Sequence, residues 1–302
     1  MTLVNTNKML NDANKKGYAI CAFNIYNLES AMAAVESAAE TKKPVILAVS
    51  ESAAKYAGMK TLVSIVSALA SEYKATVALH LDHGKSYQSC KQAIDCGFTS
   101  VMIDGSSLSL DENIKLTKKV VSYAHKHNVS VEAELGKIMG VEDLVSSKEQ
   151  LYTDPEEAYS FVQQTGVDSL AISIGTAHGI NKGLTTPKIQ FETIKSINQI
   201  LPSTPLVAHG SSSVPKEFVD IINNYGGKLN KTQGIPEKDV IKMSQIGINK
   251  INMDTDIRLA FTTAIRSEFT ENPSTFDPRT YLGRAKTLAK EYMIKMINLL
   301  NK

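Results

Sequence analysis

The sequence has no tryptophan, only three cysteines and no excess of either charge. Cys21, Cys90 and Cys96 are odd in number and lack a closely spaced pair, which argues against a disulfide scaffold and for a reduced, intracellular protein. An apolar run of about 18 residues is also missing, so we expect no membrane span, and the N-terminus has no signal-peptide pattern. Because the net charge is +2 without a dense basic cluster, nucleic-acid binding is not expected. We therefore predict a cytoplasmic protein.

The chain alternates short apolar segments, rich in β-branched residues, with longer amphipathic ones. Near-continuous apolar runs between helices are typical of parallel strands that are covered on both faces. The predicted strands span residues 18–24, 44–50, 76–82, 100–104, 130–135, 169–175, 205–209 and 250–253. Eight such units predict an α/β fold, a (β/α)8 or TIM barrel, as a single domain over residues 1–302. The alternative is an open doubly wound sheet, but no G-x-G-x-x-G motif follows the first strand.

Helix signals fill the intervals and the end of the chain. The run DPEE at residues 154–157 predicts a helix start, because proline suits the first turn and acidic residues favour the positive end of the helix dipole. Residues 223–236, rich in glycine and polar residues, are predicted to form a loop insertion. After the eighth strand we expect a C-terminal helical extension: a helix over 258–269, a proline-marked turn over 272–278 and a terminal helix.

Three of the six histidines, His83, His178 and His209, are followed directly by glycine, and each pair closes an apolar segment. The carboxyl ends of parallel strands meet at one end of a barrel, where barrel enzymes have their active sites, so three imidazoles can converge there. Three nitrogen ligands with an open fourth position are typical of catalytic zinc. His80, inside a predicted strand, is interpreted as structural.

Asp82 directly precedes the first of these histidines and is a candidate general acid/base. Strict alternation along a strand would place Asp82 and His83 on opposite faces. Both can serve one site only if the chain leaves the strand at His83, which Gly84 would permit. The alternative is that Asp82 only orients His83.

Small polar residues follow the predicted strands six to eight, where barrel enzymes usually bind a phosphate through backbone N–H groups and hydroxyls. These residues are Gly179, Gly210, Ser211, Ser212, Asp254 and Thr255. Lys182 can add a positive charge. The alternative is that they form ordinary turns.

Several segments together resemble the class II, zinc-dependent fructose-bisphosphate aldolases. They are AFNIYN (22–27), HLDHG (80–84), VEAELG (131–136), GTAHG (175–179), AHGSSSVP (208–215), NMDTDIR (252–258) and FDPRTYL (276–282). The resemblance covers nearly the whole chain in order. The loop at 223–236 and the DTDIR segment resemble the class IIb branch.

The resemblance implies a catalytic zinc held by the three histidines named above, with Glu134 as an alternative or second-site ligand. Zinc would polarise the C2 carbonyl of the sugar and stabilise the enediolate left when the C3–C4 bond breaks. Asp82 would take the proton from the C4 hydroxyl, and Glu142, on the loop after the fifth strand, would handle the C3 proton.

The resemblance also implies the binding of a ketose bisphosphate and its triose phosphate products. Gly179, Lys182, Gly210, Ser212, Asp254 and Thr255 would bind the C1 phosphate, Asn252 and Asn24 the sugar, and Ser50, Arg258 and Arg279 the C6 phosphate. A monovalent cation, Na⁺ or K⁺, is expected beside the first phosphate. We expect a homodimer or homotetramer, in which Arg279 serves its own or a neighbouring subunit's site.

Three alternatives to fructose 1,6-bisphosphate cleavage stay open at the level of sequence. The first is an aldolase for the tagatose epimer, which differs only at C4. The second is a zinc hydrolase or isomerase acting on another phosphorylated substrate. The third is a non-catalytic zinc-binding protein, which would need neither Asp82 nor Glu142.

Overall fold

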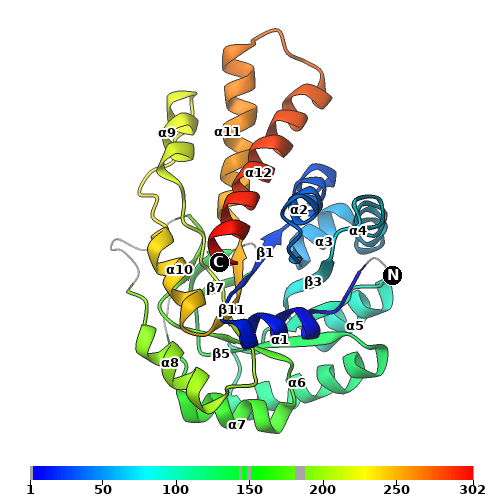
Figure 1. Cartoon of the computed structure of the whole chain (residues 1–302), viewed down its shortest axis with the longest axis vertical. Helices are drawn as coiled ribbons and strands as arrows, with labels where there is room; N and C mark the ends of the chain where they lie inside the picture. Colours follow the sequence, from blue (N-terminus) through cyan, green and yellow to red (C-terminus); the bar gives the residue numbers. More distant parts are fainter. Residues whose placement is uncertain (1–2, 143–144, 148–150, 181–187, 302) are drawn as a thin grey trace.

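Eight parallel strands close into a barrel in the computed structural model, which describes residues 3–142, 145–147, 151–180 and 188–301 (Figure 1). Around the barrel the order is β1-β11-β10-β8-β5-β4-β3-β2. Their bounds are β1 (Ile20–Asn24), β2 (Val45–Ser50), β3 (Val77–Gly84), β4 (Ser100–Ile103), β5 (Ser130–Leu135), β8 (Ser169–Ile172), β10 (Leu206–Ala208) and β11 (Ile248–Met253). All eight predicted strands are confirmed, and the open-sheet alternative is wrong.

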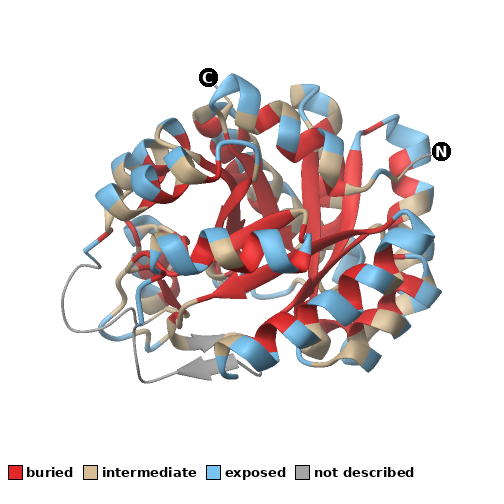
Figure 2. Ribbon diagram, turned by 90° about the horizontal axis from the view of Figure 1, so that it is seen from below, coloured by how far each residue is buried: buried red, intermediate tan, exposed pale blue. Residues whose placement is uncertain are grey.

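Helices surround the barrel, and their exposed faces point away from it (Figure 2). They are α1 (Thr6–Lys16), α2 (Leu28–Thr41), α3 (Glu51–Ala57), α4 (Met59–Tyr73), α5 (Tyr87–Cys96), α6 (Leu110–Ala124), α7 (Pro155–Thr165), α8 (Phe191–Ile200), α9 (Lys216–Asn224), α10 (Glu237–Gln245), α11 (Thr255–Glu271) and α12 (Pro278–Leu300). The predicted start of α7 is confirmed, because the Asp154 side chain accepts a hydrogen bond from the backbone N–H of Glu157. No helix in the described part of the chain is long and apolar enough to cross a membrane.

A small additional sheet lies beside the carboxyl ends of the barrel strands. It consists of β6 (Met139–Glu142), β7 (Val145–Ser147) and β9 (Ala177–His178). Strand β6 pairs in parallel with β9, so that Gly140 lies opposite His178. This pairing positions the backbone of His178 at the carboxyl end of the barrel.

Most of the apolar core lies between the barrel and the helices, whereas the barrel interior is partly polar. Inside the barrel, Met102, Ala171 and Val207 form only a small apolar cluster. Buried polar residues, among them Glu132 and Lys250, come from the same strands, β5 and β11. At the amino-terminal end, α1 packs against the first residues of β1, β2 and β3. Helix α1 therefore covers the amino-terminal end of the barrel. The barrel interior contains buried polar and charged side chains.

The C-terminal extension is a helical hairpin. Helices α11 and α12 run side by side and project beyond the other helices, joined by a turn at the top of the view in Figure 1. Helix α11 begins at Thr255, three residues before the predicted start, because it follows directly after β11. The loop expected at 223–236 is confirmed, since α9 ends at Asn224 and α10 begins at Glu237.

Candidate active site

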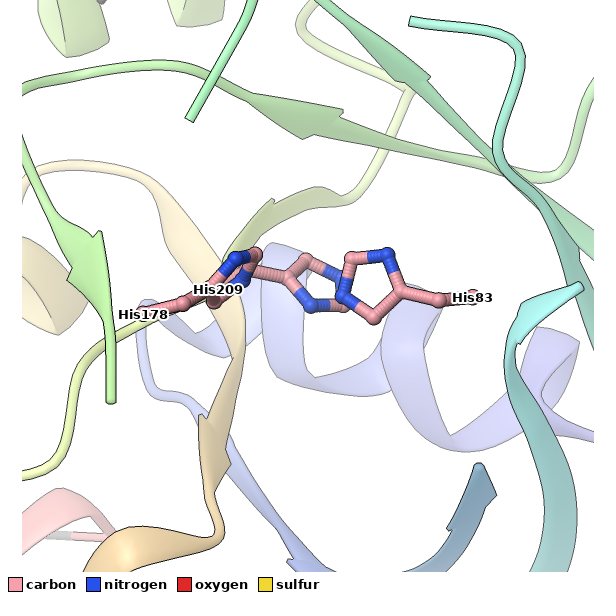
Figure 3. A group of neighbouring side chains, drawn as sticks. All are labelled: His83, His178 and His209. Carbon is pink, nitrogen blue, oxygen red and sulfur yellow. The ribbon is translucent and has the colours of Figure 1, made fainter. Parts of the chain in front are cut away.

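The three glycine-flanked histidines meet at the carboxyl end of the barrel. His83 lies near the end of β3, His178 ends β9 and His209 follows β10 directly. Each offers a ring nitrogen, and these atoms lie within 4.8 Å of one another. The ring centroids are 4.5 Å apart for His83 and His209, and 5.1 Å apart for His83 and His178. Figure 3 shows the rings gathered at one point from separate strands.

A local backbone distortion brings Asp82 and His83 to the same site. The pairing of β3 with β4 shifts register between Leu81 and Gly84, and His83 itself has a φ of 48°, in the left-handed region. We expected the chain to leave the strand at His83, and this is wrong: the strand continues through Gly84. Glycine is required at 84 for another reason, since an added Cβ would lie 2.6 Å from the carbonyl oxygen of Met102.

Carboxylates orient two of the three histidine rings. Asp104 Oδ2 lies 3.2 Å from His83 Nδ1, and Glu132 Oε1 lies 2.8 Å from His209 Nε2. In each ring, the opposite nitrogen is then left for a metal. The buried Nε2 of His83 has no hydrogen-bond partner among the described residues.

Asp82 is buried beside these rings and is held by two amides. Its Oδ2 accepts a hydrogen bond of 2.9 Å from Asn24 Nδ2, and its Oδ1 accepts one of 3.1 Å from Asn252 Nδ2. Burial raises the pKa of Asp82, but the neighbouring basic groups, His83, His209 and Lys250, outweigh it and hold the pKa well below its usual value. Asp82 is therefore an anion that can accept a proton.

Glu134 completes a second cluster, in which His83, Asp104 and Glu134 each offer an atom within 4.8 Å of the others. Burial, together with the charge of Asp104, raises the pKa of Glu134 to about 8. Its Oε2 has no hydrogen-bond partner among the described residues. A dication would reverse this preference for the neutral form. The donor set of imidazoles and carboxylates thus fits a divalent metal.

The loop after β10 is hydrogen-bonded to the buried carboxylate of Asp256. Asp256 accepts hydrogen bonds from the backbone N–H groups of Ser213, at 2.9 Å, and Val214, at 2.7 Å. Gly210 has a φ of 60°, and a Cβ there would lie 2.6 Å from the carbonyl oxygen of Ala177. Ser211 and Ser212, which follow it, are buried. The backbone of this loop is therefore hydrogen-bonded directly after the predicted phosphate residues, at Ser213 and Val214.

The remaining predicted residues on the barrel lie at other strand ends. Thr255 begins α11, and Asp254 is paired with Arg258 at 2.8 Å, although we assigned these two charges to different phosphates. Ser50 ends β2 and caps α3 by accepting a hydrogen bond from the backbone N–H of Ala53. Gly179 follows β9 with a φ of 83°.

Three predicted residues are not gathered at the site in the described structure. Arg279 stands in the first turn of α12, with 90% of its side chain exposed, and pairs with Asp277. Lys182 lies outside the described residues. Glu142 ends β6, but its side chain lies outside the description.

Our reading of the sequence missed Lys250 and gave Glu132 no role. Lys250 Nζ lies 2.7 Å from Glu132 Oε2 and 3.4 Å from His80 Nε2, inside the barrel. The available signal was a lysine at the start of the predicted strand 250–253, directly before Ile251. His80 is held at Nδ1 by Ser100 Oγ at 2.8 Å, in keeping with a structural role.

A closed eight-stranded barrel with a buried cluster of histidines and carboxylates at one end is typical of metal-dependent TIM-barrel enzymes. Residues 4–302 match the family described as class-II fructose-bisphosphate aldolase, and the chain belongs to it. The family is metal-dependent, and the three histidines form a possible metal site. The resemblance seen in the motifs is confirmed at the level of the family.

Individual relatives agree over nearly the whole chain. The fructose-bisphosphate aldolase of Thermus caldophilus is 46% identical over 299 residues, which cover 98% of this chain and 97% of that protein. The fructose-bisphosphate aldolase of Giardia intestinalis is 44% identical over 300 residues, covering 98% and 92%. Among solved structures, the YdjI aldolase of Escherichia coli K12 has a TM-score of 0.79 at 30% identity and covers 99% of this chain and 97% of that chain.

Proposed function

We propose that this protein reversibly cleaves fructose 1,6-bisphosphate to dihydroxyacetone phosphate and glyceraldehyde 3-phosphate. The observation that carries the proposal is the meeting of His83, His178 and His209 beside the buried anion of Asp82. Membership of the class II family supports the same reaction. Zinc as the metal and the class IIb branch are part of the proposal.

The residues around the histidines suit the chemistry of C3–C4 cleavage. A divalent metal, when bound by these histidines, supplies Lewis-acid polarisation of the substrate carbonyl. Asp82 accepts the proton of the C4 hydroxyl as the C3–C4 bond breaks, and it returns that proton in condensation. Asn24 and Asn252 keep Asp82 oriented toward the substrate side of the site. Glu142 is proposed to move the proton at C3.

Substrate binding is proposed to use both ends of the sugar. The C1 phosphate would lie at Gly179, Lys182, Gly210, Ser211, Ser212, Asp254 and Thr255, with Na⁺ or K⁺ beside it. Ser50, Arg258 and Arg279 would face the C6 phosphate. Because Arg279 is exposed on the projecting hairpin, we propose a homodimer or homotetramer in which it serves its own or a neighbouring site. A cytoplasmic location, suggested by the three free cysteines, also stays a proposal.

The test combines elemental analysis with a cleavage assay. The purified protein should contain one equivalent or more of zinc and should release triose phosphate from fructose 1,6-bisphosphate, faster than from the tagatose epimer. A chelator should abolish this activity and added zinc should restore it. Release of inorganic phosphate without triose phosphate would contradict the proposal and favour a hydrolase.

The role of Asp82 is tested by Asp82→Ala. The variant should retain its metal but lose turnover by at least about 10²- to 10⁴-fold, because the acid/base group is gone. Asp95→Ala, on the exposed surface of α5, is the matched control and should cleave at the normal rate. Near-normal cleavage by Asp82→Ala would overturn the assignment.

A further inference from the structure

We propose that Glu132 and Lys250 form a positioning pair inside the barrel, which selects the ring nitrogen that His209 turns toward the metal. This inference rests on the proposed metal-dependent function, because it concerns one of the three histidine ligands. It adds two residues that lie outside the proposed set of metal and substrate ligands.

The contacts that carry it form a short chain. Lys250 Nζ donates to Glu132 Oε2 at 2.7 Å, and the other oxygen of the same carboxylate lies 2.8 Å from His209 Nε2. The Lys250 side chain is fully buried, and those of Glu132 and His209 are 2% and 1% exposed. Water therefore does not compete for these groups.

The direction of each hydrogen bond follows from the chemistry of its ends. A lysine ammonium can only donate, and an ionised carboxylate can only accept. The ammonium of Lys250, 2.7 Å from Oε2, holds Glu132 as the carboxylate. Glu132 therefore accepts from His209, and the ring proton sits on Nε2. Nδ1 of His209 then carries the lone pair that a metal needs.

The Lys250 ammonium also has a second hydrogen-bond partner, on the side away from Glu132. Its Nζ lies 3.4 Å from His80 Nε2, and His80 Nδ1 lies 2.8 Å from Ser100 Oγ. Because Lys250 donates to His80 Nε2, His80 must donate from Nδ1, so this ring is also held in one tautomer. The ammonium is anchored from both sides and holds the Glu132 carboxylate in place.

An ion pair at this position is not required to fill the barrel. Apolar side chains, such as Met102 and Val207, occupy the same interior. Replacing a buried ion pair with apolar residues is often neutral or stabilising, so stability alone does not explain the pair. Orientation of a metal ligand does explain it, since a carboxylate behind a ligating histidine fixes both its tautomer and its direction.

The first experiment measures the tautomer of His209 in the metal-free protein. In ¹⁵N-histidine-labelled protein, the two-bond ¹⁵N–¹H correlations of His209, identified by their loss in His209→Gln, should show the Nε2–H form. The Nδ1–H form or an even mixture would overturn the inference, whatever metal or activity the protein has. If His209 shows the neutral Nε2–H form but the protein binds no zinc, the positioning role of Glu132 and Lys250 is supported and the proposed function is contradicted.

The second experiment uses the double variant Glu132→Gln/Lys250→Met, which removes both charges and retains side-chain size. The side-chain amide that replaces the Glu132 carboxylate in this variant can present either its oxygen or its nitrogen to His209, so the preference of His209 for one tautomer should disappear. Zinc affinity, measured by competition with a chromophoric chelator, should fall about 10- to 100-fold. A folded double variant with normal zinc affinity and a single tautomer would overturn the proposal.

A control separates positioning from general destabilisation. Thr165→Val removes a buried hydroxyl on α7 that donates 2.7 Å to the carbonyl oxygen of Phe161. Because Thr165 has no contact with the histidine cluster, the zinc affinity of the Thr165→Val variant should stay within about threefold of normal. A comparable loss of affinity in Thr165→Val would mean that lowered stability, and not the pair, explains the double variant.

Discussion

Two of the clustered histidines are each held by a carboxylate that is paired with a lysine, but the two pairs lie in opposite surroundings. Asp104 and Lys85 are 2.9 Å apart at the rim of the barrel, and 37% of the Lys85 side chain is exposed. Glu132 and Lys250 are 2.7 Å apart, and both are buried inside it. The same chemical arrangement thus occurs once beside water and once without it.

The difference determines what each lysine contributes. At the rim, Lys85 is partly exposed to water, and Asp104 keeps His83 and Ser106 as hydrogen-bond partners if Lys85 is lost, so the rim pair contributes little to stability. In the interior, the other basic neighbours of Glu132 in the described structure are His80 and His209, which carry a charge only when protonated, so Lys250 is its permanent counter-charge. Removing one partner there leaves an uncompensated buried charge. The carboxylates should matter to the metal site in both places, whereas the lysines should matter unequally.

The largest expected effect is that of Lys250→Met. The variant should lower the free energy of unfolding of the metal-free protein by about 3–5 kcal/mol, because Glu132 loses its counter-charge. Urea unfolding followed by circular dichroism measures this difference. A loss below about 1 kcal/mol would mean that the interior is more hydrated than its burial indicates, and the comparison would fail.

The rim carboxylate provides the next test. Asp104→Asn should weaken zinc binding by about 10- to 100-fold, because His83 loses the charged partner of its Nδ1. Chelator competition measures the affinity, and urea unfolding of the same samples checks that the fold is retained. If the affinity is unchanged, the Asp104 contact does not orient His83 toward a metal.

A pH-dependent effect is expected from the interior histidine, His80. Burial, with the charge of Lys250, lowers the pKa of His80 to about 3, below its ordinary value of 6.5. Between pH 6.5 and 3, His80 is therefore protonated in the unfolded chain and neutral in the folded protein. The free energy of unfolding falls as pH drops through this range. Compared with His80→Gln, the wild type should lose about 1 kcal/mol more for each pH unit in this window. Equal pH slopes in urea unfolding would contradict this.

The smallest effect is expected for Lys85→Met. Because Lys85 is partly exposed and Asp104 keeps His83 and Ser106 as partners, the free energy of unfolding should change by less than about 1 kcal/mol. Urea unfolding beside Lys250→Met gives the direct comparison. A loss at the rim as large as that in the interior would show that exposure does not distinguish the two pairs.

The fold could be predicted because its signals are local. Each strand is an apolar run between helix signals, and α7 begins where the capping residue and proline lie together, at Asp154 and Pro155. The HLDHG, GTAHG and AHGSSS motifs also marked the histidines before any geometry was known. The start of α11 was misplaced by three residues, because the sequence does not show where β11 stops and the helix begins.

The finer structure of the site could not be predicted in the same way. The left-handed backbone at His83 is uncommon outside glycine, and it accompanies a register shift between β3 and β4 that the sequence does not show. The Lys250–Glu132 bond joins residues 118 positions apart, and the Glu132–His209 bond joins residues 77 apart. Neither distance nor burial can be inferred from the spacing of these residues.

Local patterning in this chain was enough to specify eight strand–helix units and to place three histidines at the ends of strands. Closure of the barrel decided which side chains meet inside it. It brought Glu132 and Lys250 together away from water, where a hydrogen bond determines which nitrogen of His209 is free. The physical reason is that hydrophobic periodicity acts between neighbours along the chain, whereas the desolvation and pairing of charges depend on neighbours in space.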